Sequence, residues 1–159
     1  MTLSSARRID RTTYDAVAPD IVAALLSLGK AVGASGLDKQ ITELVKIRAS
    51  QINGCAFCLQ YHLNIARKLG VPASKTDLVA VWAETGIYSA RECAALAWTE
   101  ALTRMPVQPV PETVYADLFD RFSIQEVAYL TAAVATINAW NRIAGGLSFA
   151  PPIPVAGSV

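Results

Sequence analysis

Apolar residues recur along the chain at intervals of three and four positions, and no run alternates between apolar and polar residues in the manner of a strand. This period predicts an all-α fold of about six to seven helices. Glycine or proline follows most of the periodic segments, as expected where helices end. We expect helices over residues 19–31, 39–52, 54–69, 75–84, 90–104, 112–122 and 124–144.

Several of these helices have recognisable start signals. Ser89 with Glu92 and Ser123 with Glu126 match the capping box, in which the two side chains each satisfy a free backbone amide of the first turn. Ser74 is expected to cap the helix that begins at residue 75. These signals make the positions of the later helices easier to predict than those of the earlier ones.

The chain of 159 residues is long enough for one domain with a real core and too short for two ordinary domains. We predict a single domain over 1–159, with its core at about 37–146, an N-terminal helix at 19–31 and a proline-rich tail at 150–159. No internal repeat or linker divides it. A solvated and partly frayed end is expected at the N-terminal cations Arg7, Arg8 and Arg11.

Composition excludes some partners and suggests another. Fourteen basic and thirteen acidic residues leave a net charge of +1, so no long-range field favours nucleic acid. Hydrophobic residues make up 53%, above the roughly 45–50% of average soluble domains, and part of this surplus is expected between the subunits of a homo-oligomer. The apolar stretch 127–141 contains threonines and asparagines, so we interpret it as a buried helix and expect no membrane partner.

Three cysteines, with no export signal recognised near Met1, indicate thiols kept reduced in the cytoplasm. Cys93 lies among alanines and leucine, and core packing is its expected role. Cys55 and Cys58 are only three residues apart, and this pair is the most informative feature of the sequence.

Cys55, Cys58 and His62 fall within roughly 60° of one another on a helix, so they project from one face. A Cys-x-x-Cys pair at a helix start can close a disulfide, and the free amides there favour the thiolate, which is the nucleophile. His62 follows Cys58 by one turn and is suited to accept and return its proton. Glu43 can orient the imidazole if the Asn53-Gly54 turn folds the two helices together.

Two other interpretations fit the same residues. The two cysteines and His62 are three potential zinc ligands, with Glu43 or Cys93 as the fourth, although structural zinc sites usually draw on two distant pairs. Alternatively, both cysteines are small buried hydrophobes and His62 is a core histidine. We favour redox chemistry without a metal or cofactor, because the only histidine of the chain shares a face with both thiols.

Glu43, eleven further residues, Cys55-x-x-Cys58, three further residues and His62 resemble the signature of the AhpD-like alkylhydroperoxidases, within the carboxymuconolactone decarboxylase superfamily. Residues 44–54, 94–104 and 137–142 resemble the same family, and the likeness covers about 37–146. One departure is Phe57, which stands where the best-known members have a second histidine of the proton relay. A relay here is expected to run through water or directly from Glu43.

The resemblance implies an all-α subunit that forms a dimer, trimer or hexamer. It also implies that Cys58 attacks a small organic hydroperoxide and that Cys55 resolves the resulting sulfenic acid as a disulfide. A lipoyl-bearing or thioredoxin-like protein would then supply the electrons. Two alternatives remain: a non-enzymatic redox sensor or interaction module switched by the Cys55–Cys58 bond, and a ring-opening decarboxylase of the wider superfamily.

Overall fold

The computed structural model describes residues 9–155 and confirms the expected all-α fold, with eight α-helices, one 3₁₀ helix and no strand in that range. Six predicted helices are confirmed, with ends that agree to within a few residues. They are α2 (Pro19–Gly33), α3 (Lys39–Ile52), α4 (Ala56–Lys68), α6 (Ala90–Arg104), α7 (Glu112–Arg121) and α8 (Ile124–Gly146).

The helix expected at 75–84 is divided into α5 (Ala73–Leu78) and the 3₁₀ helix η1 (Val79–Glu84), and Val81 has non-helical dihedral angles (φ −122°, ψ 29°). The prediction that Ser74 caps this segment is wrong. Pro72 is the N-cap, and its carbonyl accepts hydrogen bonds from the amides of Lys75 and Thr76. Both capping boxes, at Ser89 and Ser123, are confirmed.

An additional helix, α1 (Arg11–Val17), precedes α2. The prediction of a frayed cationic end is therefore wrong for Arg11, which begins α1 and donates from Nε to Asp15 Oδ1 at 2.7 Å. Arg7 and Arg8 lie outside the described residues. Because α1 has only seven residues, it is too short to be stable alone and depends on contacts with the rest of the molecule, although none of its residues is fully buried.

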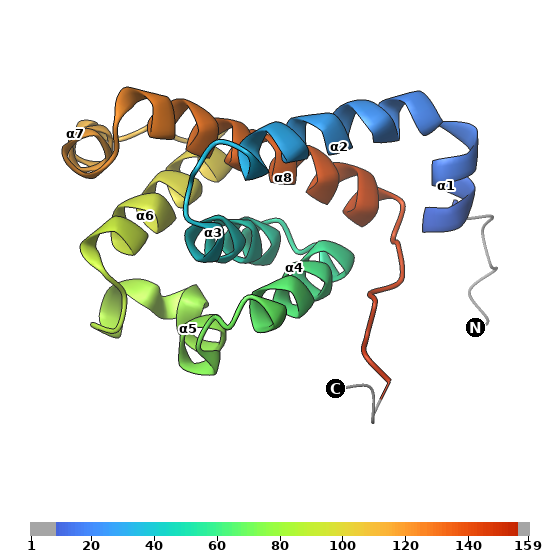
Figure 1. The fold of residues 1–159 in the computed structure, drawn as a ribbon, viewed down its shortest axis with the longest axis horizontal. Coiled ribbons are helices and arrows are strands. Elements are labelled where there is room, and N and C mark those ends of the chain that lie inside the picture. The colour runs from blue at the N-terminus through green and yellow to red at the C-terminus, as the bar shows by residue number, and fades with distance from the viewer. Residues whose placement is uncertain (1–8, 156–159) are drawn as a thin grey trace.

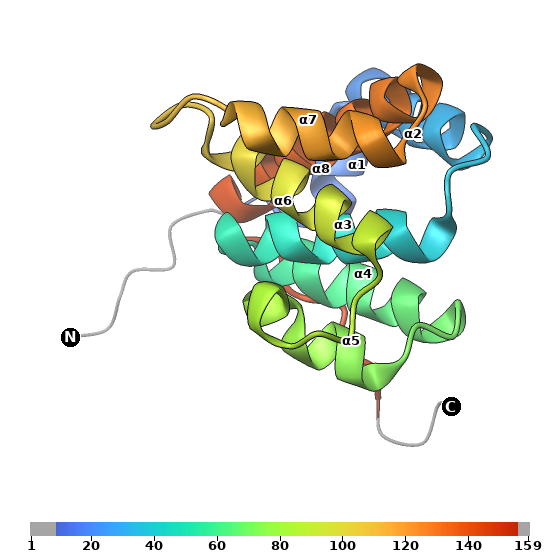
Figure 2. The ribbon, with the colours of Figure 1, turned by 90° about the vertical axis from the view of Figure 1, so that its left-hand side faces the viewer.

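Helix α3 occupies the centre of the molecule and packs against α4, α6 and α8 (Figures 1 and 2). Helix α2 lies along α8 on the outer side, and α7 packs against α6 and α8. After α8 the chain runs past α4 in extended form, where Asn64 Nδ2 donates to the carbonyl of Pro152 at 2.9 Å (Figure 1).

The buried apolar residues form three clusters around α3, and each fully buried Leu or Ile contributes roughly 1.5–3 kcal/mol. The first lies between α3, α6, α7 and α8 and includes Val45, Leu118 and Leu130. The second lies on the α4–α5 side of α3. The third joins α3, α4 and α8, and its buried members are Ala49, Cys55, Cys58, Ile137, Ala144 and Phe149.

Helix α8 contains the apolar stretch 127–141 and buries one face, while its threonine hydroxyls donate to backbone carbonyls of the preceding turn. It is therefore confirmed as a largely buried helix. Within residues 9–155 no single helix has the length and apolar character of a membrane span. Among these residues only α1 and α2 taken together reach that length and hydropathy, and the two helices are bent by 102° relative to each other.

Candidate active site

The turn between α3 and α4 places the cysteine pair. Gly54 has φ +67°, and the amides of Gly54 and Cys55 donate to the carbonyls of Gln51 (3.2 Å) and Ser50 (3.0 Å). This is the Schellman arrangement, in which a glycine takes the left-handed conformation after the last helical turn. Cys55 is the residue that both ends this turn and caps the next helix. The turn folds α4 back along α3.

Cys55 and Cys58 are both free thiols, and they are 1% and 3% exposed. As the N-cap of α4, Cys55 Sγ accepts a hydrogen bond from the backbone amide of Cys58 at 3.2 Å. Gly145 of α8 packs against Cys55, since a Cβ on that glycine would lie 3.9 Å from the cysteine Cβ. The two sulfurs therefore lie at the junction of α4 and α8.

The two thiols do not ionise independently. The hydrogen bond from the Cys58 thiol, helped by backbone amides and Asn141, lowers the pKa of Cys55 to about 6 despite its burial. The same thiol-to-thiol hydrogen bond and burial raise the pKa of Cys58. The pair thus favours one thiolate that shares the remaining proton, as expected for adjacent groups of like charge.

His62 and Glu43 are in direct contact. His62 Nδ1 lies 2.7 Å from Glu43 Oε2, and Lys46 Nζ donates to Glu43 Oε1 at 2.7 Å. Burial raises the pKa of Glu43, but the hydrogen bonds and charges of His62 and Lys46 outweigh this effect and leave it below its usual range. The carboxylate is therefore ionised at neutral pH and can orient the imidazole and stabilise its cation.

Asn141 is a buried polar residue beside the thiols that sequence reasoning did not single out as a site residue. It is 3% exposed, donates to Ser50 Oγ at 3.0 Å and accepts from Asn53 Nδ2 at 2.9 Å. Its side chain also forms hydrogen bonds that lower the pKa values of both cysteines. The available signal was weak, because Asn141 is one of several polar residues of the mainly apolar stretch 127–141.

A cavity of about 320 Å³ opens beside Cys58 and His62, which both line it. Its wall is mostly apolar and comes mainly from α2, α4 and α8, with Arg11 of α1 and Lys46 of α3 also lining it. Phe57 and Tyr61 of α4 line the cavity with their rings stacked, 6.1 Å between centroids. Phe57, the residue noted above as a departure from the AhpD-like pattern, therefore places a hydrophobic ring in edge contact with Phe149.

Cys93 lies apart from this site. It is a half-buried residue of α6 that packs against the second apolar cluster, and burial raises the pKa of its thiol. It is therefore not placed to complete a zinc site with Cys55 and Cys58. Within residues 9–155 no three His, Cys, Asp or Glu side chains are grouped closely enough to hold a metal ion.

The family model described as the carboxymuconolactone decarboxylase family matches residues 19–101 of the 159. The chain belongs to this family. The matched part runs from the start of α2 into α6, so it contains Glu43, both paired cysteines and His62. The AhpD-like resemblance expected from the sequence motif is consistent with this membership.

Individual relatives support the same assignment. The uncharacterized protein YdfG of Bacillus subtilis (strain 168) is 34% identical over 133 residues, which make up 84% of this chain and 90% of YdfG. A crystal structure from Agrobacterium tumefaciens, of a protein of unknown function suggested to be the antioxidant defence protein AhpD, is also 34% identical. The likeness has a TM-score of 0.87 and covers 93% of this chain and 100% of that one. The chain is thus an AhpD-like member of the carboxymuconolactone decarboxylase family.

The same fold occurs in the debrominase Bmp8, with a TM-score of 0.76 over 84% of this chain and 72% of Bmp8. At 21% identity, this likeness shows a shared fold alone. Membership of the carboxymuconolactone decarboxylase family and the AhpD-like neighbour support a peroxidase-related or decarboxylase-family function for this chain.

Proposed function

We propose that this protein is a thiol peroxidase that reduces small organic hydroperoxides with Cys55 and Cys58 as its dithiol. The observation that carries the proposal is the position of Cys58 and His62 on the wall of one apolar cavity, with His62 held by the buried carboxylate of Glu43. A thiol, a proton acceptor and a space for an apolar substrate therefore meet at one place.

Cys58 is proposed as the attacking residue, because it lines the cavity whereas Cys55 does not. One proton of the thiol pair passes to His62, whose cation Glu43 stabilises, and the proton that remains passes from Cys58 to Cys55 along their hydrogen bond. The Cys58 thiolate then attacks the outer oxygen of the hydroperoxide. The O–O bond breaks, Cys58 becomes a sulfenic acid, and the alkoxide takes the proton from His62 to leave as an alcohol.

Cys55 completes the cycle. Its sulfur attacks the sulfenic sulfur of Cys58, the S–O bond breaks, and the hydroxide leaves as water with the proton that Cys55 carried. The net reaction converts two thiols and one hydroperoxide into a disulfide, an alcohol and water. A dithiol donor, for example a lipoyl-bearing or thioredoxin-like protein, then reduces the disulfide by thiol exchange.

Phe57 next to Cys58 cannot accept or donate a proton, so the proposed proton relay has no second histidine at this position. Since His62 Nδ1 faces Glu43, Nε2 is the nitrogen that exchanges protons with the substrate. In this proposal His62 both accepts the thiol proton and returns it. Glu43 acts only through His62, and Lys46 acts only through its hydrogen bond to Glu43.

The test is the rate of hydroperoxide consumption in the presence of excess dithiothreitol. The wild type is compared with Cys58→Ser, Cys55→Ser and the matched control Cys93→Ser, whose thiol lies in another cluster. We expect Cys58→Ser to lose turnover and the control to match wild type. In a separate reaction without dithiothreitol, Cys55→Ser treated with hydroperoxide should accumulate a sulfenic acid that a tagged dione traps. Equal rates for wild type and Cys58→Ser would contradict the proposal.

We also propose that the subunit forms a homo-oligomer. Ile21, Leu26 and Leu28 of α2 are 41–49% exposed, which is apolar surface of the kind that subunit contacts cover. Sizing chromatography of the reduced and oxidised protein tests this. A change of assembly state with negligible turnover would instead support a redox sensor.

A further inference from the structure

The cavity beside Cys58 has a charge pattern that the peroxidase chemistry does not use. Its lining includes three cations, Arg11, Lys30 and Lys46, and no Asp or Glu of the described residues. Two of the three are neutralised, because Arg11 pairs with Asp15 and Lys46 with Glu43, each at 2.7 Å. Lys30 has no ion pair within residues 9–155 and is exposed. An otherwise apolar cavity therefore carries one uncompensated positive charge.

Arg11 is held in place over this cavity. Its guanidinium carbon lies 5.0 Å from the ring centroid of Trp140 and 5.8 Å from that of Phe57, so it stacks over aromatic residues of the wall. Asp15 binds only Nε, which leaves the N–H groups of the two Nη atoms as donors. The 102° bend between α1 and α2 brings Arg11 back towards α8.

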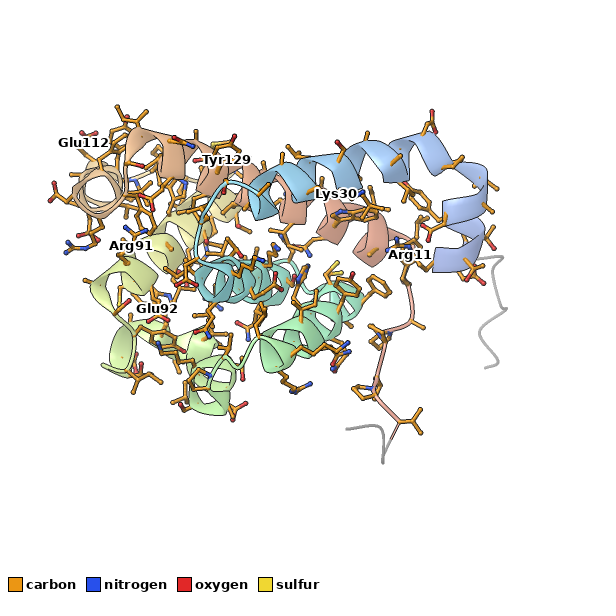
Figure 3. The ribbon with its side chains drawn as sticks, viewed as in Figure 1. Arg11, Lys30, Arg91, Glu92, Glu112 and Tyr129 are labelled. Atoms are coloured by element: carbon orange, nitrogen blue, oxygen red, sulfur yellow. The ribbon has the colours of Figure 1, made fainter. Side chains whose placement is uncertain are left out.

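Lys30 and Arg11 lie along the same opening. Lys30 extends on the side of α2 nearest α8, and Arg11 lies where α1 approaches the C-terminal end of α8 (Figure 3). Neither cation is a principal cause of the altered thiol pKa values, which come from the cysteine pair itself, burial, Asn141 and backbone amides. Formation of the thiolate therefore does not account for the position of these two cations.

We propose that the cavity selects hydroperoxides with a compact apolar body and a single carboxylate, which Lys30 and Arg11 bind while the body lies against the apolar wall. The chemistry of this inference rests on the proposed peroxidase function. A single carboxylate matches the one uncompensated charge, and the Nη groups can bind it with two hydrogen bonds. The volume of about 320 Å³ lies at the small end of the roughly 300–1,000 Å³ typical of ligand sites, which favours aromatic or short-chain acids.

The test compares cumene hydroperoxide with its para-carboxylate, which differ only in the charged group. We expect wild type to prefer the carboxylate by about tenfold or more in kcat/KM, as one charge-assisted hydrogen bond provides. The variant Lys30→Gln removes the one uncompensated charge and should lower this ratio several-fold, because the Arg11 that remains is already paired with Asp15. The control Lys39→Gln changes an exposed cation of α3 that does not line the cavity, and it should keep the wild-type ratio.

A binding measurement separates this inference from the peroxidase proposal. The alcohols that correspond to the two hydroperoxides are unreactive, and their dissociation constants follow from calorimetric titration of the reduced protein. We expect the carboxylate alcohol to bind about tenfold more tightly than the neutral one, and Lys30→Gln to reduce the difference several-fold. Equal binding of the two alcohols, or an unchanged preference in Lys30→Gln, overturns the inference. Failure to consume either hydroperoxide overturns the peroxidase proposal alone.

Discussion

His62 Nδ1 and Glu43 Oε2 lie 2.7 Å apart although nineteen positions separate the two residues in the sequence. The contact joins α3 to α4 and uses both carboxylate oxygens of Glu43, since Lys46 binds the other one. A buried carboxylate with two partners is fixed in place and in turn fixes the orientation of the imidazole. The proton-transfer step of the proposed reaction depends on this contact.

Replacing Glu43 with glutamine tests that dependence. The amide keeps the shape of the side chain but removes the negative charge that stabilises the His62 cation, so we expect hydroperoxide reduction to slow on the order of a hundredfold. The measurement is kcat/KM over a range of pH, because the variant should also change the pH profile. Glu112→Gln on the exposed first turn of α7 is the control. Similar rates for wild type and Glu43→Gln would show that Glu43 has no part in the reaction.

The lowered pKa of Cys55 predicts a pH-dependent stability for the reduced protein. Between the folded pKa of about 6 and the ordinary thiol value of 9.0, the unfolded chain binds more protons at Cys55 than the folded one. Stability should therefore rise with pH across this window and lose the gain as pH falls through 6. Denaturant unfolding at several pH values, in a Cys93→Ser background, measures the slope. If Cys55→Ser shows the same slope, the thiolate does not contribute.

The cause of the Cys55 pKa can be tested separately. Its largest contribution is the hydrogen bond from the Cys58 thiol, so Cys58→Ala should move the pKa of Cys55 upwards. The rate of alkylation as a function of pH gives this value directly, again without Cys93. If the pH midpoint of Cys55 alkylation is the same in Cys58→Ala as in wild type, the backbone amides at the start of α4 cause the low pKa instead.

Asn141 is predicted to act as a positioning residue for the thiol pair. In Asn141→Ala, Ser50 loses its hydrogen-bond donor and Asn53 loses one acceptor, which should cost about 1–3 kcal/mol of stability. The same change should raise the thiol pKa values, because the Asn141 hydrogen bonds lower both. Asn64→Ala on α4 is the matched control, because Asn64 donates to the carbonyl of Pro152 and accepts from Gln60 and Arg67, away from the thiols. Identical thiol titrations for Asn141→Ala and wild type would contradict the assignment.

Ser148 is the one described non-glycine residue with a positive φ, at 56°. It stands in the turn after α8, where the Phe149 amide donates to the Ala144 carbonyl at 2.9 Å and Phe149 then packs beside the cysteine pair. Since left-handed backbone is strained for serine, Ser148→Gly should stabilise the protein by about 0.5–1 kcal/mol. Gly70→Ala, at φ 74° in the equivalent turn after α4, should destabilise it by a similar amount. Thermal unfolding measures both changes, and a less stable Ser148→Gly would be the wrong sign.

Local signals predicted most helices because capping and periodicity act within one or two turns. The capping boxes at Ser89 and Ser123 marked the starts of α6 and α8 correctly. The seven residues of α1 are too few to be stable alone, and tertiary contacts such as that of Arg11 with Trp140 hold them. Because the sequence does not show these distant contacts, it predicts a solvated end at Arg11, where the structure has a helix.

The sequence by itself determined that Cys58 and His62, about one turn apart in α4, share a face of that helix, because helix pitch alone decides this relation. Cys55 is the non-helical N-cap of α4, so helix pitch does not set its direction. Only the tertiary structure decided what surrounds them. Asn141 from α8, Arg11 from α1 and Lys30 from α2 reach this region because the helices fold against one another, and no local pattern encodes such distant contacts. Helix geometry thus sets the order of the reactive groups, and helix packing sets their burial, their charge environment and the cavity they face.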